Sequence, residues 1–131
     1  MLAQLQPVIK ELQTARILFA DDEKIILDAM KNILPHLCNR VYFAQNGHEG
    51  LKLAQKHKVD LVITDISMPS MGGIEMVHAI REINPHVKVI FLTGHSHEDL
   101  DYLDMRYPQE LLVKPISTKK LFSTLEKIYL K

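Results

Sequence analysis

Residues 61–76 read LVITDISMPSMGGIEM, and this stretch decides the fold. It opens with a nearly continuous apolar run, residues 61–64, in which polar and apolar side chains do not alternate. Such a run is typical of a parallel strand that is buried on both faces of a sheet. Asp65 follows directly, and helical spacing begins at Ile74. The stretch therefore predicts a strand, a polar loop at its carboxyl end, and a helix.

Four further apolar runs of the same kind occur along the chain: residues 16–20 (RILFA), 41–44 (VYFA), 87–92 (VKVIFL) and 111–113 (LLV). They alternate with stretches that favour helices. Five such βα units predict an α/β fold, an open parallel sheet with helices on both faces. Ligands of such sheets bind beyond the carboxyl ends of the strands, so a functional site is expected there.

Apolar residues at helical spacing mark three of the helices. They are Ile26, Ala29, Met30, Ile33 and Leu37 on the first, Ile74, Val77, Ile80 and Ile83 on the third, and Leu121, Leu125 and Ile128 on the last. We expect Ser117 to cap the last helix and Asn84-Pro85 to end the third. The spacing is weaker in residues 47–56, and residues 95–106 are polar at their start.

The composition predicts one globular domain and excludes several classes of protein. The 131 residues are 47% hydrophobic, and 16 basic residues balance 16 acidic ones. This balance argues against direct binding of nucleic acid or of an anionic membrane. The single cysteine, Cys38, cannot form an intrachain disulfide and is interpreted as a small packing residue. No signal peptide or membrane span is apparent, so we expect a cytoplasmic protein.

Residues 1–14 precede the first strand and form a short N-terminal extension, with the domain proper predicted at residues 15–131. Leu2, Leu5, Ile9 and Leu12 form a short apolar seam. Pro7 interrupts it, so a helix is expected from about Pro7 onward at most. A partly ordered leader is the favoured interpretation, and a helix that packs on the domain or on a second subunit is the alternative.

Polar residues follow four of the predicted strands. Asp21 and Asp22 follow the first, Asp65 the third, Thr93-Gly94 the fourth and Lys114-Pro115 the fifth. Clustered carboxylates repel one another unless a cation is present, and oxygen ligands suit Mg²⁺. A carboxylate is also a competent nucleophile for phosphoryl transfer, and Mg²⁺ with Lys114 would neutralise the phosphoryl oxygens. Each residue alone is as readily a helix cap or a solvated loop residue, but together they predict one site.

These motifs resemble the receiver domains of two-component response regulators, the CheY-like family. RILFADDE resembles the first strand and acidic pair, LVITDISMPSMGGIEM the phosphoacceptor segment, and FLTGH and LLVKP the Thr and Lys-Pro signatures. The resemblance covers about residues 15–131. It implies a flavodoxin-like, doubly wound (βα)₅ sheet with strand order 2-1-3-4-5.

The resemblance also implies a role for each site residue. Asp65 would be the phosphoacceptor. Mg²⁺ would be held by Asp22, by Asp21 largely through water, by Asp65 and by the backbone carbonyl of Ser67. Thr93 would be the switch hydroxyl and Lys114 the phosphate-binding amine. The phosphodonor would be a histidine kinase or a histidine phosphotransfer protein, with a further protein as the downstream target.

Some positions depart from the family pattern or modulate it. Leu111 stands three residues before the lysine, where many receivers carry an aromatic switch residue. Ser67 and His95, two after Asp65 and Thr93, should border the path of water to an acyl phosphate and set its lifetime. His95 pointing into solvent without a role is the competing interpretation.

The main alternative function is a degenerate receiver that acts as a phosphorylation-independent interaction module. A metabolic enzyme on the same fold is not expected. A flavodoxin-type phosphate loop and a GxxxxGK[ST] motif are absent, and the acidic pair is adjacent rather than two apart as in dehalogenase-type phosphatases. The sequence fits both a stand-alone receiver and a fragment of a larger regulator.

Overall fold

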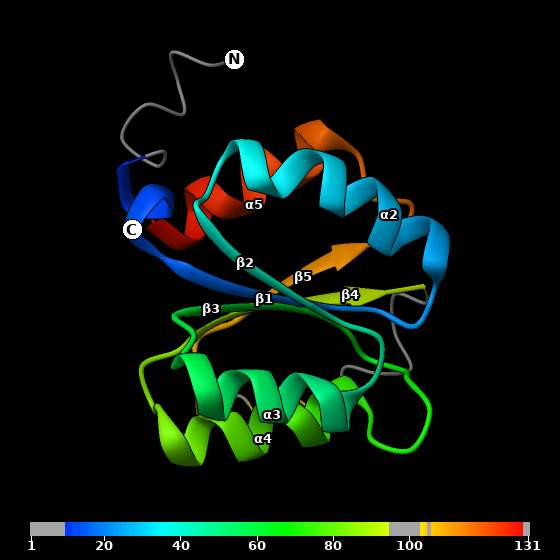
Figure 1. Ribbon diagram of the computed structural model, residues 1–131, viewed down its shortest axis with the longest axis vertical. Coiled ribbons are helices and arrows are strands. Elements are labelled where there is room, and N and C mark those ends of the chain that lie inside the picture. Colours follow the sequence, from blue (N-terminus) through cyan, green and yellow to red (C-terminus); the bar gives the residue numbers. More distant parts are fainter. Residues whose placement is uncertain (1–9, 95–102, 105, 130–131) are drawn as a thin grey trace.

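The computed structural model contains a five-stranded parallel sheet between two layers of helices (Figure 1). It describes residues 10–94, 103–104 and 106–129. The strands are β1 (Arg16–Ala20), β2 (Arg40–Ala44), β3 (Leu61–Asp65), β4 (Lys88–Thr93) and β5 (Glu110–Val113). Their order in the sheet is β2-β1-β3-β4-β5. The predicted flavodoxin-like order is thus confirmed, and each predicted strand agrees within a residue at either end.

Helices of the described part of the chain cover both faces of the sheet (Figure 1). On one face lie α2 (Lys24–Ile33) and α5 (Thr118–Tyr129), and on the other α3 (Gly47–His57) and α4 (Gly73–Ile83). Each pair closes a separate apolar core. Leu121 and Leu125 belong to the first core, and Met76 and Ile80 to the second. All residues of β3 are buried, as its unbroken apolar sequence predicts for a central strand.

Side chains define several helix ends. The Asn46 side chain accepts a hydrogen bond from the backbone N–H of Glu49 at 2.9 Å and caps α3. Ser117 Oγ accepts one from the backbone N–H of Lys120 at 3.1 Å, so the predicted cap of α5 is confirmed. The extended backbone of Asn84 ends α4, as the following proline requires.

The first helix differs from its prediction. It ends at Ile33, and the turn Leu34–His36 that follows is a 3-10 helix with Pro35 near its start. Proline has no N–H for the helical hydrogen bond, which explains the break. The buried residues of α2 are Leu27 and Met30, whereas Ala29 is exposed. Of the fourth predicted helix, only residues 103, 104 and 106 are described, and these are not helical.

The described part of the N-terminal extension packs on the domain. Residues 10–14 are helical, and Leu12 is only 2% exposed within the core beneath α2 and α5. For these residues the alternative interpretation, a helix packed on the domain, is the correct one. Leu2, Leu5 and Ile9 lie outside the described residues.

Cys38 lies in the same core and is 2% exposed. Its thiol contacts the Ala15 carbonyl oxygen at 3.0 Å, which joins the end of the N-terminal helix to the segment before β2. Burial raises the pKa of this thiol. The packing interpretation of Cys38 is therefore confirmed.

Arg81 at the end of α4 holds the segment that leads into β5. Its guanidinium is buried, lies 4.5 Å from the centre of the Tyr107 ring and donates a hydrogen bond to Gln109 Oε1 at 2.9 Å. These contacts fix the start of β5, and so contribute to the position of Lys114 at its end. None of the described helices is long and apolar enough to span a membrane.

Candidate functional site

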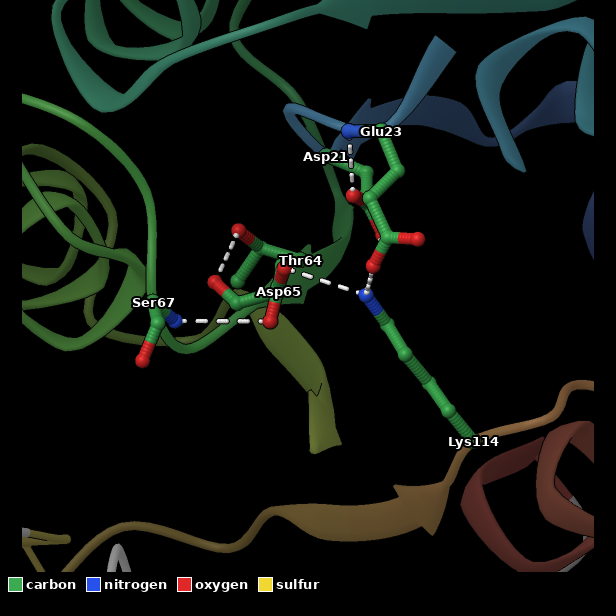
Figure 2. Close-up of polar contacts among 6 residues, drawn as sticks. All are labelled: Asp21, Glu23, Thr64, Asp65, Ser67 and Lys114. Carbon is green, nitrogen blue, oxygen red and sulfur yellow. Dashed lines mark hydrogen bonds and ion pairs between the residues drawn. The ribbon is translucent and has the colours of Figure 1, made fainter. Parts of the chain in front are cut away.

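The carboxyl ends of the parallel strands bring the predicted site residues to one edge of the sheet. Asp21 directly follows β1, Asp65 ends β3, Thr93 ends β4 and Lys114 directly follows β5. Carboxylate oxygens of Asp21, Asp22 and Asp65 lie within 4.8 Å of one another. Residues far apart in the sequence thus form one acidic cluster, and Figure 2 shows the Lys114 side chain reaching across to it.

The Lys114 amine contacts three carboxylates. Its Nζ lies 3.0 Å from Asp21 Oδ2, 3.1 Å from Asp65 Oδ2 and 2.8 Å from Glu23 Oε1. Asp21 and Asp65 were expected beside it, but sequence reasoning assigned no role to Glu23. An acidic residue after an acidic pair at the start of a helix looks like an ordinary solvated residue, so no signal in the sequence identified it.

Main-chain contacts hold Asp21 in place. Its N–H donates to the Ala44 carbonyl at 3.0 Å, and its Oδ1 accepts from the backbone N–H of Glu23 at 2.9 Å. Its Oδ2 is buried and has the ion pair with Lys114, but no donor among the described residues meets hydrogen-bond geometry there. A buried carboxylate oxygen without a hydrogen bond is an atom that a bound cation would satisfy.

The loop after β3 shapes the surroundings of Asp65. Thr64 Oγ1 donates to the Asp65 carbonyl at 2.9 Å, and the backbone N–H of Ser67 donates to Asp65 Oδ1 at 3.3 Å. The loop returns so closely that a Cβ on Gly73 would collide with the Asp65 carbonyl oxygen. This close approach is the physical reason for glycine at the start of α4.

Thr93 and Lys114 are joined through the main chain. The Lys114 N–H donates to the Thr93 carbonyl at 2.8 Å, and Thr93 is 3% exposed. The Lys114–Pro115 peptide is cis. Leu111, the predicted switch position, is half-buried and packs against the core on the α3 and α4 face. His95 lies outside the described residues, so its predicted role at the site stays a prediction.

Burial and charge shift the pKa values in the site. Burial is the main cause of a raised pKa for both Asp21 and Asp65, and it outweighs their contacts with Lys114. Burial would lower the pKa of Lys114, but its contacts with the carboxylates of Glu23, Asp21 and Asp65 raise it above its ordinary value. Lys114 is therefore cationic at neutral pH.

The donor set fits a hard divalent cation. It consists of clustered carboxylate oxygens, without a histidine or cysteine among the described residues of the cluster. Mg²⁺ prefers such oxygen ligands and is commonly held by one or two carboxylates together with water. With Lys114 close by, the cluster can hold a cation and can neutralise an anionic group bound beside it.

Comparison with known proteins identifies the family that shares these features. A family profile described as the response regulator receiver domain matches residues 17–126. The uncharacterized transcriptional regulatory protein YesN of Bacillus subtilis is 35% identical over 117 residues, which cover 86% of this chain and 32% of YesN. The transcriptional regulatory protein HptR of Staphylococcus aureus is 31% identical, covering 81% of this chain and 43% of HptR. The chain thus spans less than half the length of these curated relatives.

Solved structures agree on the fold. The chemotaxis response regulator CheY4 of Vibrio cholerae has a TM-score of 0.78 and 31% identity, covering 87% of this chain and 98% of CheY4. In the CheX–CheY–BeF3–Mg²⁺ complex of Borrelia burgdorferi, the matching chain has a TM-score of 0.78 at 24% identity. It covers 89% of this chain and 90% of that one. At this identity the second match supports the fold alone.

Proposed function

The chain belongs to the response regulator receiver domain family of two-component systems, and on this premise we propose that Asp65 accepts a phosphoryl group in a Mg²⁺-dependent reaction. The donor is a phosphohistidine on a histidine kinase or a histidine phosphotransfer protein, and the acyl phosphate is the signal. This family is one of signalling domains rather than of metabolic enzymes.

One observation carries the proposal: a lysine amine and three clustered carboxylates share one edge of the sheet. Bound Mg²⁺ would lower the repulsion between these carboxylates and the phosphoryl oxygens. Asp21, Asp22, Asp65 and the Ser67 carbonyl would hold it. Both oxygens of Asp65 are fixed, Oδ1 by the Ser67 N–H and Oδ2 by Lys114, so the carboxylate is oriented before the donor arrives.

The proposed reaction is an in-line transfer. An Asp65 oxygen forms a bond to phosphorus while the bond from phosphorus to the histidine nitrogen breaks, and the histidine leaves with that electron pair and takes up a proton. The Lys114 ammonium neutralises a phosphoryl oxygen. The Thr93 hydroxyl would donate to another phosphoryl oxygen and would act as the switch hydroxyl. Ser67 and His95 would border the path of the hydrolytic water. Because Leu111 stands where many receivers carry an aromatic ring, a rotamer-driven change at the face of the fourth predicted helix would be small.

The wider setting belongs to the same proposal. Residues 15–131 would act as the receiver and residues 1–14 as an extension, although Leu12 takes part in the receiver core. The reaction would occur in the cytoplasm. A protein target would receive the signal, and this chain itself would not bind nucleic acid. A longer regulator containing it would act as the named relatives do, in transcription.

Labelling by acetyl phosphate tests the proposal. Wild-type protein should be phosphorylated in millimolar Mg²⁺ and should not be in EDTA. Asp65→Asn should abolish labelling, because an amide is not a competent nucleophile. Asp28→Asn is the matched control, since Asp28 is an exposed residue in the middle of α2, and its labelling should equal that of wild type.

Two results would contradict the proposal. Undiminished labelling of Asp65→Asn would show that another residue accepts the phosphoryl group. A wild-type chain that is not labelled by acetyl phosphate or by a phosphohistidine donor would favour the alternative, a receiver fold used as an interaction module.

A further inference from the structure

Glu23 contacts two residues of the site, Asp21 through its backbone and Lys114 through its side chain. Its backbone N–H donates to Asp21 Oδ1 at 2.9 Å, and its Oε1 lies 2.8 Å from Lys114 Nζ (Figure 2). Glu23 also stands at the N-cap position of α2, where a side chain commonly caps the helix. The Glu23 side chain makes no such capping bond, and the polar contact described for this side chain is the one with Lys114.

Glu23 contacts the amine rather than the proposed metal site. The carboxylates close enough to share an ion are Asp21, Asp22 and Asp65, and Glu23 is not among them. The Glu23 side chain is 57% exposed, whereas that of Lys114 is 13% exposed. An ion pair with one well-solvated partner contributes little to stability and can open readily.

We propose that Glu23 is a positioning residue that holds the Lys114 amine in the resting site and competes for it with the incoming phosphoryl group. This inference rests on the proposed function. The Lys114 ammonium group donates hydrogen bonds to Glu23 Oε1 and Asp65 Oδ2, and Asp21 Oδ2 is an ion-pair partner 3.0 Å away. An ammonium group has three N–H donors, so a phosphoryl oxygen that approaches Lys114 competes with these carboxylates for the amine.

Glu23 is the carboxylate best placed to withdraw. Asp21 and Asp65 are buried and are proposed metal ligands, so their positions are fixed on both accounts. Glu23, by contrast, is exposed and is not a proposed metal ligand. Its negative charge also opposes the approach of a phosphoryl group. Competition and repulsion act in the same direction, so Glu23 limits how strongly the site binds a phosphoryl group.

The test uses beryllofluoride, a stable mimic of the phosphoryl group, with saturating Mg²⁺ and calorimetry. Glu23→Gln should bind beryllofluoride severalfold more tightly than wild type and should be labelled faster by acetyl phosphate. Asp28→Asn, which removes one exposed negative charge elsewhere on α2, should bind as wild type does. Unchanged or weaker binding by Glu23→Gln would overturn the inference.

A double-mutant cycle separates contact from charge. In a Lys114→Gln background, Glu23→Gln should lose most of its gain, because the amine for which Glu23 competes is gone. A gain that persists in full would assign the effect to net charge and overturn the positioning role. Mg²⁺ affinity measured without beryllofluoride should change only modestly, and a large loss would make Glu23 a metal ligand instead.

The wild-type arm distinguishes the two proposals. If wild type binds beryllofluoride and is labelled by acetyl phosphate but Glu23→Gln behaves identically, only the role of Glu23 fails. If wild type does neither, the proposed phosphoacceptor function fails, and the role of Glu23 fails with it.

Discussion

Asp21 and Asp65 are carboxylates held in a buried place, and burial raises the pKa of each. Compared with the unfolded chain, the metal-free folded protein therefore favours the protonated forms of these two carboxyl groups. Their contribution to stability is present in full below the pKa of the unfolded chain, about 3.9, and is lost as the pH rises through the higher folded-state pKa values. At neutral pH the two charges should thus destabilise the metal-free protein.

The predicted destabilisation by ionised Asp21 and Asp65 can be tested by urea unfolding in EDTA. Asp65→Asn and Asp21→Asn, which cannot ionise, should be more stable than wild type at pH 7, and the difference should shrink toward pH 4.5. Saturating Mg²⁺ should stabilise wild type by mass action and reverse the order of stability. Variants that are less stable than wild type at pH 7 in EDTA would contradict the cause assigned to these shifts.

At the same scale, the sequence predicted part of the site and missed another part. The resemblance assigned roles to Asp21, Asp65 and Lys114, and the structure brings these side chains into contact. Glu23 was missed because contact with an amine 91 residues later depends on the loop after β5. The local sequence does not show which of several acidic side chains contacts a lysine that lies far along the chain.

Among the elements, the strands were more predictable than the N-terminal helix. A short, unbroken apolar run between polar segments is typical of a buried strand, whereas a short seam interrupted by proline fits a leader as well as a packed helix. Burial distinguishes a packed helix from a leader, and Leu12 is 2% exposed in a core that includes Leu34 and Leu125. Burial of this kind depends on tertiary packing, which the spacing of two turns does not contain.

Leu12→Ala tests the contribution of this helix. Truncating a buried leucine costs about 2–5 kcal/mol, and we expect about 2–3 kcal/mol because the surface segment can adjust. The measurement is the free energy of unfolding in urea. Gln13→Ala, an exposed neighbour in the same helix, is the control and should lie within about 0.5 kcal/mol of wild type. Equal stabilities for Leu12→Ala and wild type would mean that residues 10–14 do not contribute to the core.

For the whole molecule, the alternation of strands and helices predicted a layered parallel sheet but not the order of its strands. The order 2-1-3-4-5 came with the family resemblance, and the structure confirms it. Periodicity shows which face of an element is buried, whereas strand order depends on how crossovers pack. Of the two apolar cores that result, the one beneath α2 and α5 contains the chain's single thiol.

The buried thiol of Cys38 makes this chain suitable for site-selective chemical labelling. A protonated, inaccessible thiol reacts slowly with aromatic disulfides such as Ellman's reagent, since the thiolate is the reactive form. Native wild type should release almost no chromophore at pH 7.5, and one equivalent should appear in denaturant. Ile25→Cys, at a position that is 84% exposed, should release one equivalent at once and the second only on unfolding.

Rapid reaction of the native wild-type thiol would show that this core opens frequently. If Cys38 is silent as expected, a dye or spin label can be attached to a single engineered cysteine without first removing the natural one. The slow reaction of Cys38 itself would then report, in the same sample, how often the core is exposed to solvent.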